Sequence, residues 1–320
     1  EGLDAPVFRI RETLGSDVFD AVTLDAAHNS LMQAYGSVPD DWRTIASVKT
    51  TSDFKNVNAA RLGGMGNLTT VAENMEYTML AQADEKVTYP IEKRGNLLSI
   101  SMEAQFGDQI GAFNSQSELL GKSAKNTLNE FVLGTLFDDN PTCDYDSVAL
   151  FAAGHSNTSA TSPLSHDNLE KAIAGIINQT GVASEKIYLR PKALIVPPAR
   201  VLLARELIRS ATLDYGGRAV VGSAGASAAA PGGASNAIPD FLSIVLASPH
   251  IDASSGANQY VVADHPVIEV SFLRGETEPA ILREPEQTGR SFITDSITWK
   301  VRHVYGGDVI EHRAAYRLVN

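Results

Sequence analysis

The chain has 320 residues, of which 43% are hydrophobic and 20% are charged. This composition is typical of folded proteins and excludes a disordered chain, and the length favours two lobes or one lobe with long extensions. The formal net charge of -12 repels phosphate backbones, so sequence-specific binding of nucleic acid is not expected.

The cysteine content and the length of the apolar runs exclude further classes of protein. Cys143 is the single cysteine, which excludes intramolecular disulfides and multi-cysteine metal sites and fits assembly in a reducing cytoplasm. No apolar run approaches the roughly 20 residues that span a bilayer, so we expect no membrane partner. The chain begins at Glu1 and not at methionine, which either proteolytic maturation or a trimmed chain explains.

Residues 1–60 are rich in polar and turn residues, with scattered apolar anchors such as Phe8, Leu31 and Trp42. A short helix over Val18 to Tyr35 is expected, but the segments around it are too sparse in apolar residues for a core of their own. The sequence therefore predicts an N-terminal arm.

Strand-forming residues dominate from Asn67 to Glu103. Two β-rich stretches, at 69–79 and 87–91, precede a turn predicted at Glu92 to Asn96 and a further strand at 97–102. Because an isolated two-stranded ribbon is only marginally stable, we expect this long hairpin to lean on another subunit.

Apolar residues from Asp108 to Phe137 recur at intervals of three, four and seven, which predicts the longest helix of the chain. At about 1.5 Å per residue this helix would span roughly 45 Å and serve as a mechanical spine. An ordinary core helix, broken near Gly121, is the alternative.

Further elements follow in the second half of the chain. Ser165 is a good N-cap for a helix that ends before Gly181, and a strand at Ala193 to Val196 leads through Pro197-Pro198 into another helix. Small residues at 222–236 predict a flexible loop. Strands are then expected at 241–247, 259–263 and 267–272, and at 296–305 and 309–316 as a pair across Gly306-Gly307. Helices and strands do not alternate regularly, so the predicted fold class is α+β.

Motifs that would carry chemistry are incomplete. The seven histidines nowhere show a metal-ligand spacing, and Gly154-His155-Ser156 lacks the GxSxG context of a hydrolase serine. Gly63-Gly64-Met65-Gly66 lacks the lysine of a phosphate-binding loop and is interpreted as a hinge. We therefore expect no enzyme, no catalytic or metal site and no cofactor.

Three cations lie on the predicted hairpin of an otherwise acidic chain: Lys86, Lys93 and Arg94. They are candidate inter-subunit contacts, because they would let the hairpin lie over an acidic neighbour. A solvated strand edge explains the same three residues equally well.

Local sequences carry a resemblance to a known family. Asp146-Ser147-Val148-Ala149-Leu150-Phe151, then Gly154-His155-Ser156-Asn157, and the closing segments at 299–307 and 313–320 follow one another in a familiar order. Together with the arm, hairpin, spine helix and mixed lobe, they resemble the tailed-bacteriophage major capsid family of the Hong Kong 97 fold. Within that family they are similar to Mu-like major head subunits.

The resemblance implies an α+β fold with five parts. These are an N-terminal arm at 1–60, an E-loop at 66–103, a P-domain at 104–184 with its spine helix at 108–137, an A-domain at 185–290, and closing P-domain strands at 291–320.

The resemblance also implies the function of a major capsid protein. Pentamers and hexamers of this chain would form an icosahedral shell that encloses double-stranded DNA, assembled in the cytoplasm of the host bacterium with portal and decoration proteins as further partners. An N-terminal segment would be removed by a protease. The alternatives are an encapsulin-like compartment and a serine hydrolase that uses Ser156 and His155.

Overall fold

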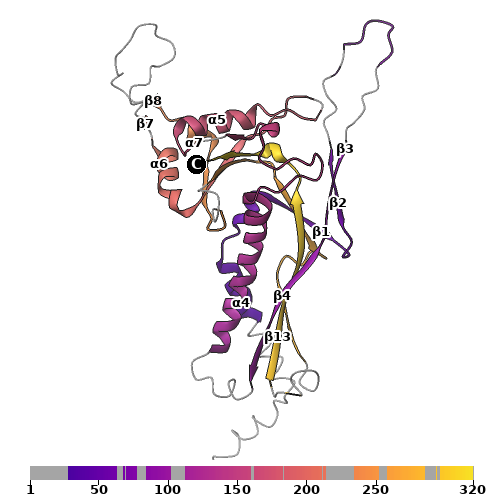
Figure 1. Ribbon diagram of the computed structural model, residues 1–320, viewed down its shortest axis with the longest axis vertical. Helices are drawn as coiled ribbons and strands as arrows, with labels where there is room; N and C mark the ends of the chain where they lie inside the picture. Colours follow the sequence, from indigo (N-terminus) through magenta and orange to yellow (C-terminus); the bar gives the residue numbers. More distant parts are fainter. Residues whose placement is uncertain are drawn as a thin grey trace, which may run out of the picture.

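The computed structural model describes residues 28–62, 68, 70–77, 84–101, 112–159, 162–182, 184–210, 212–213, 234–251, 258–284, 293 and 296–319. Among them are two five-stranded sheets and two short two-stranded ribbons. The view in Figure 1 places α4 (Ala112–Asn129) beside a long ribbon of β4 (Glu92–Ser101) and β13 (Ser296–Val309), below a lobe of helices and strands. The described part of the chain contains both helices and strands, as the predicted α+β fold class requires.

The first five-stranded sheet is built around β13, which spans 14 residues. It runs in the order β1-β11-β13-β12, and β4 also pairs with β13. β13 is antiparallel to β4, β11 (Ile268–Leu273) and β12 (Ala280–Arg283), whereas β1 (Ala46–Thr51) is parallel to β11. Paired on both sides, β13 ties together segments from the beginning, middle and end of the chain.

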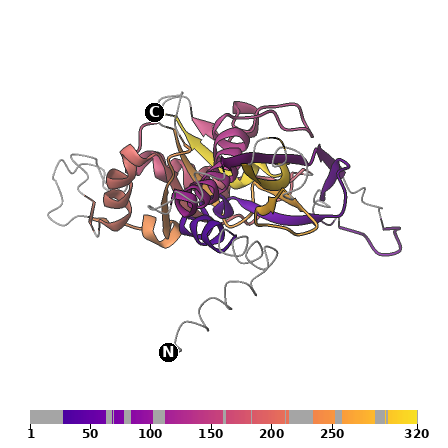
Figure 2. The same ribbon diagram turned by 90° about the horizontal axis from the view of Figure 1, so that it is seen from below.

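The second sheet runs in the order β5-β14-β10-β6-β9. Its central strands β10 (Gln259–Ala263) and β6 (Pro191–Val196) are almost entirely buried, as their continuous apolar runs favour. The outer strands are β5 (Thr158–Ser159), β14 (Ala315–Leu318) and β9 (Ile244–Ala247), and the helices beside this sheet are α5 (His166–Ile177), α6 (Val201–Arg209) and α7 (Ile238–Phe241). Figure 2 places the α6 side of this lobe and the hairpin of β2 (Val57–Leu62) and β3 (Asp84–Tyr89) at opposite ends of the molecule.

The predicted spine helix is confirmed over its described part. α4 continues without a break into a π-helical segment, η2 (Glu130–Asp138), so the chain is helical from 112 to 138. Gly121 does not interrupt the helix. The absence of a side chain at this position allows close packing, because a Cβ there would lie 2.3 Å from the carbonyl oxygen of Leu31. The helical residues 28–37 thus pack directly on the spine.

Other predicted elements are also confirmed. The Ser165 hydroxyl caps α5 by accepting a hydrogen bond from the Asn168 amide, and Pro198 opens the short η4 turn (Pro198–Arg200) that leads into α6. β6 and β10 cover the expected strands, and β11 begins within one residue of its expected start.

The predicted N-terminal arm at 1–60 stays a prediction, and several residues of its described part, 28–60, are buried in the body of the protein. Leu31, Trp42 and Ile45 are fully buried, and the indole of Trp42 packs 6.0 Å from the ring of Phe272. After the short η1 turn (Asp41–Thr44), β1 joins the first sheet. Few but large apolar side chains therefore suffice, because they complete a core supplied by distant residues.

Two turns predicted from glycine are wrong. Residues 92–96 lie inside β4, and Gly306-Gly307 lie inside β13, which runs unbroken to Val309. A Cβ on Gly95 would lie 2.3 Å from the Val301 carbonyl oxygen, and one on Gly306 would lie 2.0 Å from that of Pro90. These glycines permit close approach of backbones in a crowded ladder and do not form turns.

The remaining differences concern register and boundaries. The hairpin is formed by β2 (Val57–Leu62) and β3 (Asp84–Tyr89), and the described residues 70–77, where a strand was expected, are not in a strand. The strand expected at 241–247 begins only at Ile244, because α7 occupies the preceding residues. The predicted loop at 222–236 lies outside the described residues except for its last three.

The predicted domain boundaries do not coincide with the two sheets. β11, from the predicted A-domain range, pairs with β13, and β14, from the predicted closing strands, pairs with β10 in the other sheet. A separate observation concerns membranes: no helix in the described part of the chain has the length and apolar character needed to cross a bilayer.

Candidate assembly surfaces

The β2–β3 hairpin is anchored at its root by two buried polar contacts. The hydroxyl of Tyr89, at the end of β3, lies 2.8 Å from Glu269 Oε1 and 2.7 Å from Ser271 Oγ on β11. Lys49 on β1 adds an ion pair of 2.6 Å to the same Glu269 carboxylate, which is itself buried. These bonds hold the hairpin to the first sheet.

Arg61 on β2 forms the second anchor. Its guanidinium lies 3.3 Å from Glu85 on β3 and 3.3 Å from Glu311 near the carboxyl end, and it stacks 4.9 Å above the ring of Tyr145. The arginine is almost fully buried, a position that charged residues occupy only when paired. Arg61 and Tyr89 were not singled out by sequence reasoning, because their partners lie far away in the chain.

Beyond this root, the hairpin exposes large apolar side chains. Leu68, Met75 and Tyr77 have exposed fractions of 90%, 66% and 87%. Single exposed apolar residues are ordinary, but three on one excursion are candidates for burial against another protein. Leu97 on β4 and Leu119 on α4 are exposed in the same way on the body of the molecule.

The three predicted inter-subunit cations do not form one basic patch. Lys86 is exposed on β3, in the two-stranded ribbon, whereas Lys93 is exposed on β4, in the first five-stranded sheet. Arg94 follows Lys93 in the same strand, so the two side chains point to opposite faces of the sheet. Lys86 and Lys93 remain available as contacts to a neighbour.

Arg94 is instead engaged within its own chain. Its guanidinium lies 4.3 Å above the ring of Phe131 and 4.5 Å above that of Tyr305, and it donates hydrogen bonds to the Tyr305 carbonyl at 3.1 Å and to Glu92 at 2.9 Å. The side chain is only 26% exposed. Its main role in the described structure is to join β4 to the spine and to β13.

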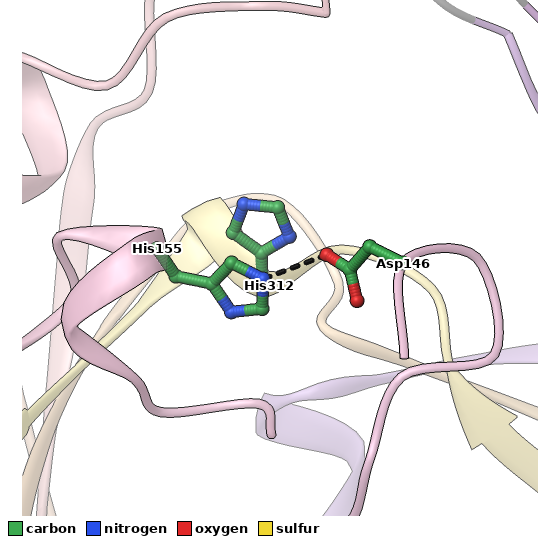
Figure 3. A group of neighbouring side chains, drawn as sticks. All are labelled: Asp146, His155 and His312. Carbon is green, nitrogen blue, oxygen red and sulfur yellow. Dashed lines mark hydrogen bonds and ion pairs between the residues drawn. The ribbon is translucent and has the colours of Figure 1, made fainter. Parts of the chain in front are cut away.

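His155, which sequence reasoning weighed as half of a catalytic pair, belongs to a clasp of two buried histidines and the exposed Asp146, shown in Figure 3. Its Nε2 lies 2.7 Å from Asp146 Oδ2 and its Nδ1 lies 3.0 Å from the Leu150 carbonyl, while its ring stacks on His312 with centroids 3.8 Å apart. Both ring nitrogens therefore lie within hydrogen-bond distance of an oxygen. The neighbouring Ser156 is exposed and has a positive φ of 52°.

His312 completes the clasp as a neutral ring. Burial, then the charge of His155, lowers the pKa of His312 to about 2, and burial raises the pKa of Tyr145. The Tyr145 hydroxyl therefore keeps its proton, and it lies within hydrogen-bond distance of His312 Nδ1, at 2.7 Å. The clasp ties the loop after the spine helix to the segment before β14.

Asp146, His155 and His312 also offer three ligand atoms within 4.8 Å of one another. The lone pair of an imidazole nitrogen lies in the plane of its ring, and the two rings are parallel to within 11°. One ion could not lie in both ring planes without rotation of a ring. The stacking therefore favours a hydrogen-bonded clasp over a metal-binding set.

Comparisons with known proteins agree with this architecture. Residues 84–318 match a protein family described as phage capsid protein. The capsid structure of the cyanophage P-SCSP1u is similar over 87% of this chain and 87% of its own, with 10% identity and a TM-score of 0.52. A structure from Microbacterium phage Oxtober96 is similar over 88% of this chain and 90% of its own, with 12% identity and a TM-score of 0.53.

An encapsulin shares the fold as well. The SrpI encapsulin complex from Synechococcus elongatus PCC 7942 is similar over 88% of this chain and 88% of its own, with 8% identity and a TM-score of 0.52. No curated protein matches the chain. These likenesses confirm the predicted capsid fold, whereas the predicted similarity to Mu-like head subunits is not shown by them.

Proposed function

This chain belongs to the phage capsid protein family, and on that premise we propose that copies of it assemble into pentamers and hexamers of an icosahedral shell enclosing a double-stranded DNA genome. As a member of the family it is a major capsid protein, a subunit of the shell in the virion. The observation that carries the proposal is the family match, which covers residues 84–318 on a chain with the capsid fold.

The domain division stays a proposal: an E-loop at 66–103, a P-domain at 104–184 with closing strands at 291–320, and an A-domain at 185–290. The proposed E-loop includes β3 and the excursion of the β2–β3 hairpin. The root of the β2–β3 hairpin is fixed by Tyr89 and Arg61, while the excursion of this hairpin exposes Leu68, Met75 and Tyr77. Because a two-stranded hairpin is marginal by itself, covering it on a neighbouring subunit stabilises both chains. Such overlaps add interface beyond the roughly 1,600 Å² of a standard complex.

Lys86 and Lys93 are the proposed charged contacts of this overlap, because both are exposed on a chain of net charge -12. Opposite charge across an interface fixes register and speeds association more than it adds affinity. The same acidic balance suits a wall that encloses DNA without sequence-specific contacts. Portal and decoration proteins are further proposed partners, and assembly is proposed to occur in the host cytoplasm.

The hairpin excursion offers a direct test of the assembly proposal. Met75→Ser combined with Tyr77→Ser removes two exposed apolar side chains, and Glu73→Ser combined with Glu76→Ser is the matched control on the same loop. We expect the first pair to reduce the yield of closed shells strongly, as measured by sedimentation, while circular dichroism of the subunit stays unchanged. Equal yields of shells from both double variants would contradict a covered hairpin.

The contents of the shell distinguish a phage capsid from an encapsulin-like compartment. The compartment is the alternative function, because the SrpI encapsulin shares the fold. A capsid of the proposed kind encloses nuclease-protected double-stranded DNA in infected cells, whereas a compartment encloses cargo protein. No catalytic role is proposed for Ser156. A serine-directed probe that labels the wild-type chain but not the Ser156→Ala variant would overturn that part of the proposal.

A further inference from the structure

A cavity of about 190 Å³ lies between the spine helix and the β4–β13 ribbon, the two elements that run side by side in Figure 1. Leu120, Ala124 and Thr127 on one face of α4 form one wall, and β4 and β13 form the other. Asn96, Ser123 and Thr127 are exposed and mark the mouth of the cavity. On the strand side, Arg94 of β4 and His303 and Tyr305 of β13 line the cavity.

Two buried side chains in this lining carry polar atoms without a partner. His303 is 5% exposed and Tyr305 is 1% exposed. Among the described residues, the hydroxyl of Tyr305 has no hydrogen-bond partner, and the ring nitrogens of His303 have none at ordinary hydrogen-bond geometry, although the Thr277 carbonyl lies near enough to His303 to favour its protonated form. A buried polar group left unsatisfied costs about 1–3 kcal/mol, and such groups are rare in native proteins. A bound group that supplies hydrogen bonds would remove this penalty.

The charge around the cavity indicates what that group is. Arg94 contributes a guanidinium 4.5 Å from the ring of Tyr305, with two of its donors used by Glu92 and the Tyr305 carbonyl. Burial lowers the pKa of His303 to about 4, with smaller contributions from the charges of Lys125 and Arg94, and the Thr277 carbonyl opposes the shift. Burial raises the pKa of Tyr305 to about 12, so its hydroxyl keeps a proton to donate.

The donors, the positive charge and the apolar wall together fit one chemical class. We propose that this cavity is a binding site for a carboxylate on a short aliphatic stem, which accepts hydrogen bonds from Tyr305 and His303, faces Arg94, and lays its stem on Leu120 and Ala124. A volume of about 190 Å³ corresponds to about six water molecules, enough for a glutamate side chain but below the range of pockets for larger ligands.

Two sources can supply this carboxylate: an acidic side chain of a neighbouring copy, or a free dicarboxylate. The first source rests on the proposed assembly, and the second does not. Charge complementarity supports the first, since each copy brings 38 acidic residues and the cavity mouth lies on a face that also exposes Leu119 on the same helix. The experiment therefore needs one arm on unassembled subunits and one on shells.

The first arm titrates unassembled subunits with glutarate and, as a neutral isostere, glutaramide, and follows binding by calorimetry. Glutarate should bind and glutaramide should not. Tyr305→Phe keeps the ring but removes the donor and should weaken glutarate binding about tenfold or more, because hydrogen bonds to a charged acceptor are strong. Tyr188→Phe is the control, since that residue is 96% exposed and does not line the cavity. Urea denaturation verifies that both variants fold.

The second arm determines the cavity contents in assembled shells by electron cryomicroscopy. Density from a neighbour's acidic side chain, together with loss of glutarate binding on assembly, assigns the site to the subunit interface. Glutarate binding that persists in shells assigns it to a free dicarboxylate. Water alone in shells, with no binding of glutarate to subunits, would overturn the proposal. If no shells form, the assembly proposal fails and the titration alone decides the cavity.

Discussion

Substituting Gly121 by alanine tests how closely the amino-terminal helix packs on the spine. A Cβ at this position would lie 2.3 Å from the Leu31 carbonyl oxygen and 3.2 Å from Ala34 Cβ. Alanine is favoured over glycine inside a helix by about 1 kcal/mol, whereas overpacking a core costs about 1–3 kcal/mol. A backbone carbonyl cannot rotate away, so residues 28–37 must shift by about 1 Å to restore van der Waals separation.

We therefore expect Gly121→Ala to lower the free energy of unfolding by up to about 2 kcal/mol, once the gain in helix propensity is subtracted. Gly134→Ala on the same continuous helix is the matched control. There the nearest atom to a new Cβ is Glu130 Oε1 at 3.0 Å, at the end of a side chain that is 62% exposed and free to rotate.

The control should be neutral or stabilising by up to about 1 kcal/mol, because the propensity gain is opposed only by a weak surface ion pair with His250. Urea denaturation of unassembled subunits, followed by circular dichroism, measures both changes. A stabilised Gly121→Ala variant, or equal effects at the two positions, would refute the close packing of residues 28–37 on α4.

Three other perturbations probe the anchors and the core. Tyr89→Phe should cost about 1–3 kcal/mol, because it leaves the buried Glu269 with one donor fewer, and hydrogen exchange should quicken in β2 and β3 first. Phe137→Ala should cost about 3–5 kcal/mol in urea denaturation, since it empties an aromatic cluster in which Phe137 lies 4.6 Å from Tyr260; a cost below about 1 kcal/mol would contradict that packing. The depressed pKa of His303, about 4, means that its contribution to stability is complete above pH 6.5 and is lost as the pH falls toward 4, by up to about 3 kcal/mol. The His303→Phe variant should lose less stability than the wild type between pH 7 and 4.5, and an identical pH dependence would argue against a buried neutral ring.

Local signals predicted the elements that local physics determines. The Ser165 cap and the apolar face of α5, the run of β6 and the periodicity of the spine are all visible within windows of a few residues, and the structure has each of them. The order of these elements also sufficed for the capsid resemblance, which the family match over residues 84–318 bears out.

Non-local contacts account for the failures. Gly95 and Gly306 have the composition of turns, but each lies where another backbone approaches within van der Waals distance, and that approach depends on strands far away in sequence. Residues 28–60 contain few apolar residues, so the sequence indicates no core of their own. Trp42 is nevertheless buried, because it packs on Phe272, which lies 230 positions later in the chain.

The candidate surfaces show the same division. Exposed cations such as Lys86 and Lys93 could be predicted from charge against an acidic background, although no local signal indicates that they lie in separate sheets. Arg94 is turned inward by two aromatic rings that come from α4's continuation and from β13. Arg61 and the cavity beside Tyr305 are invisible to a linear reading, because every partner is distant in the chain.

Negative-stain electron microscopy of the purified protein, alongside its sedimentation, tests the central claim most directly. A major capsid protein of this fold should form closed icosahedral particles under assembly-permissive conditions, with a sedimentation coefficient far above that of a 34.2 kDa subunit. A uniform monomer or dimer under the same conditions would contradict a shell built from this chain alone.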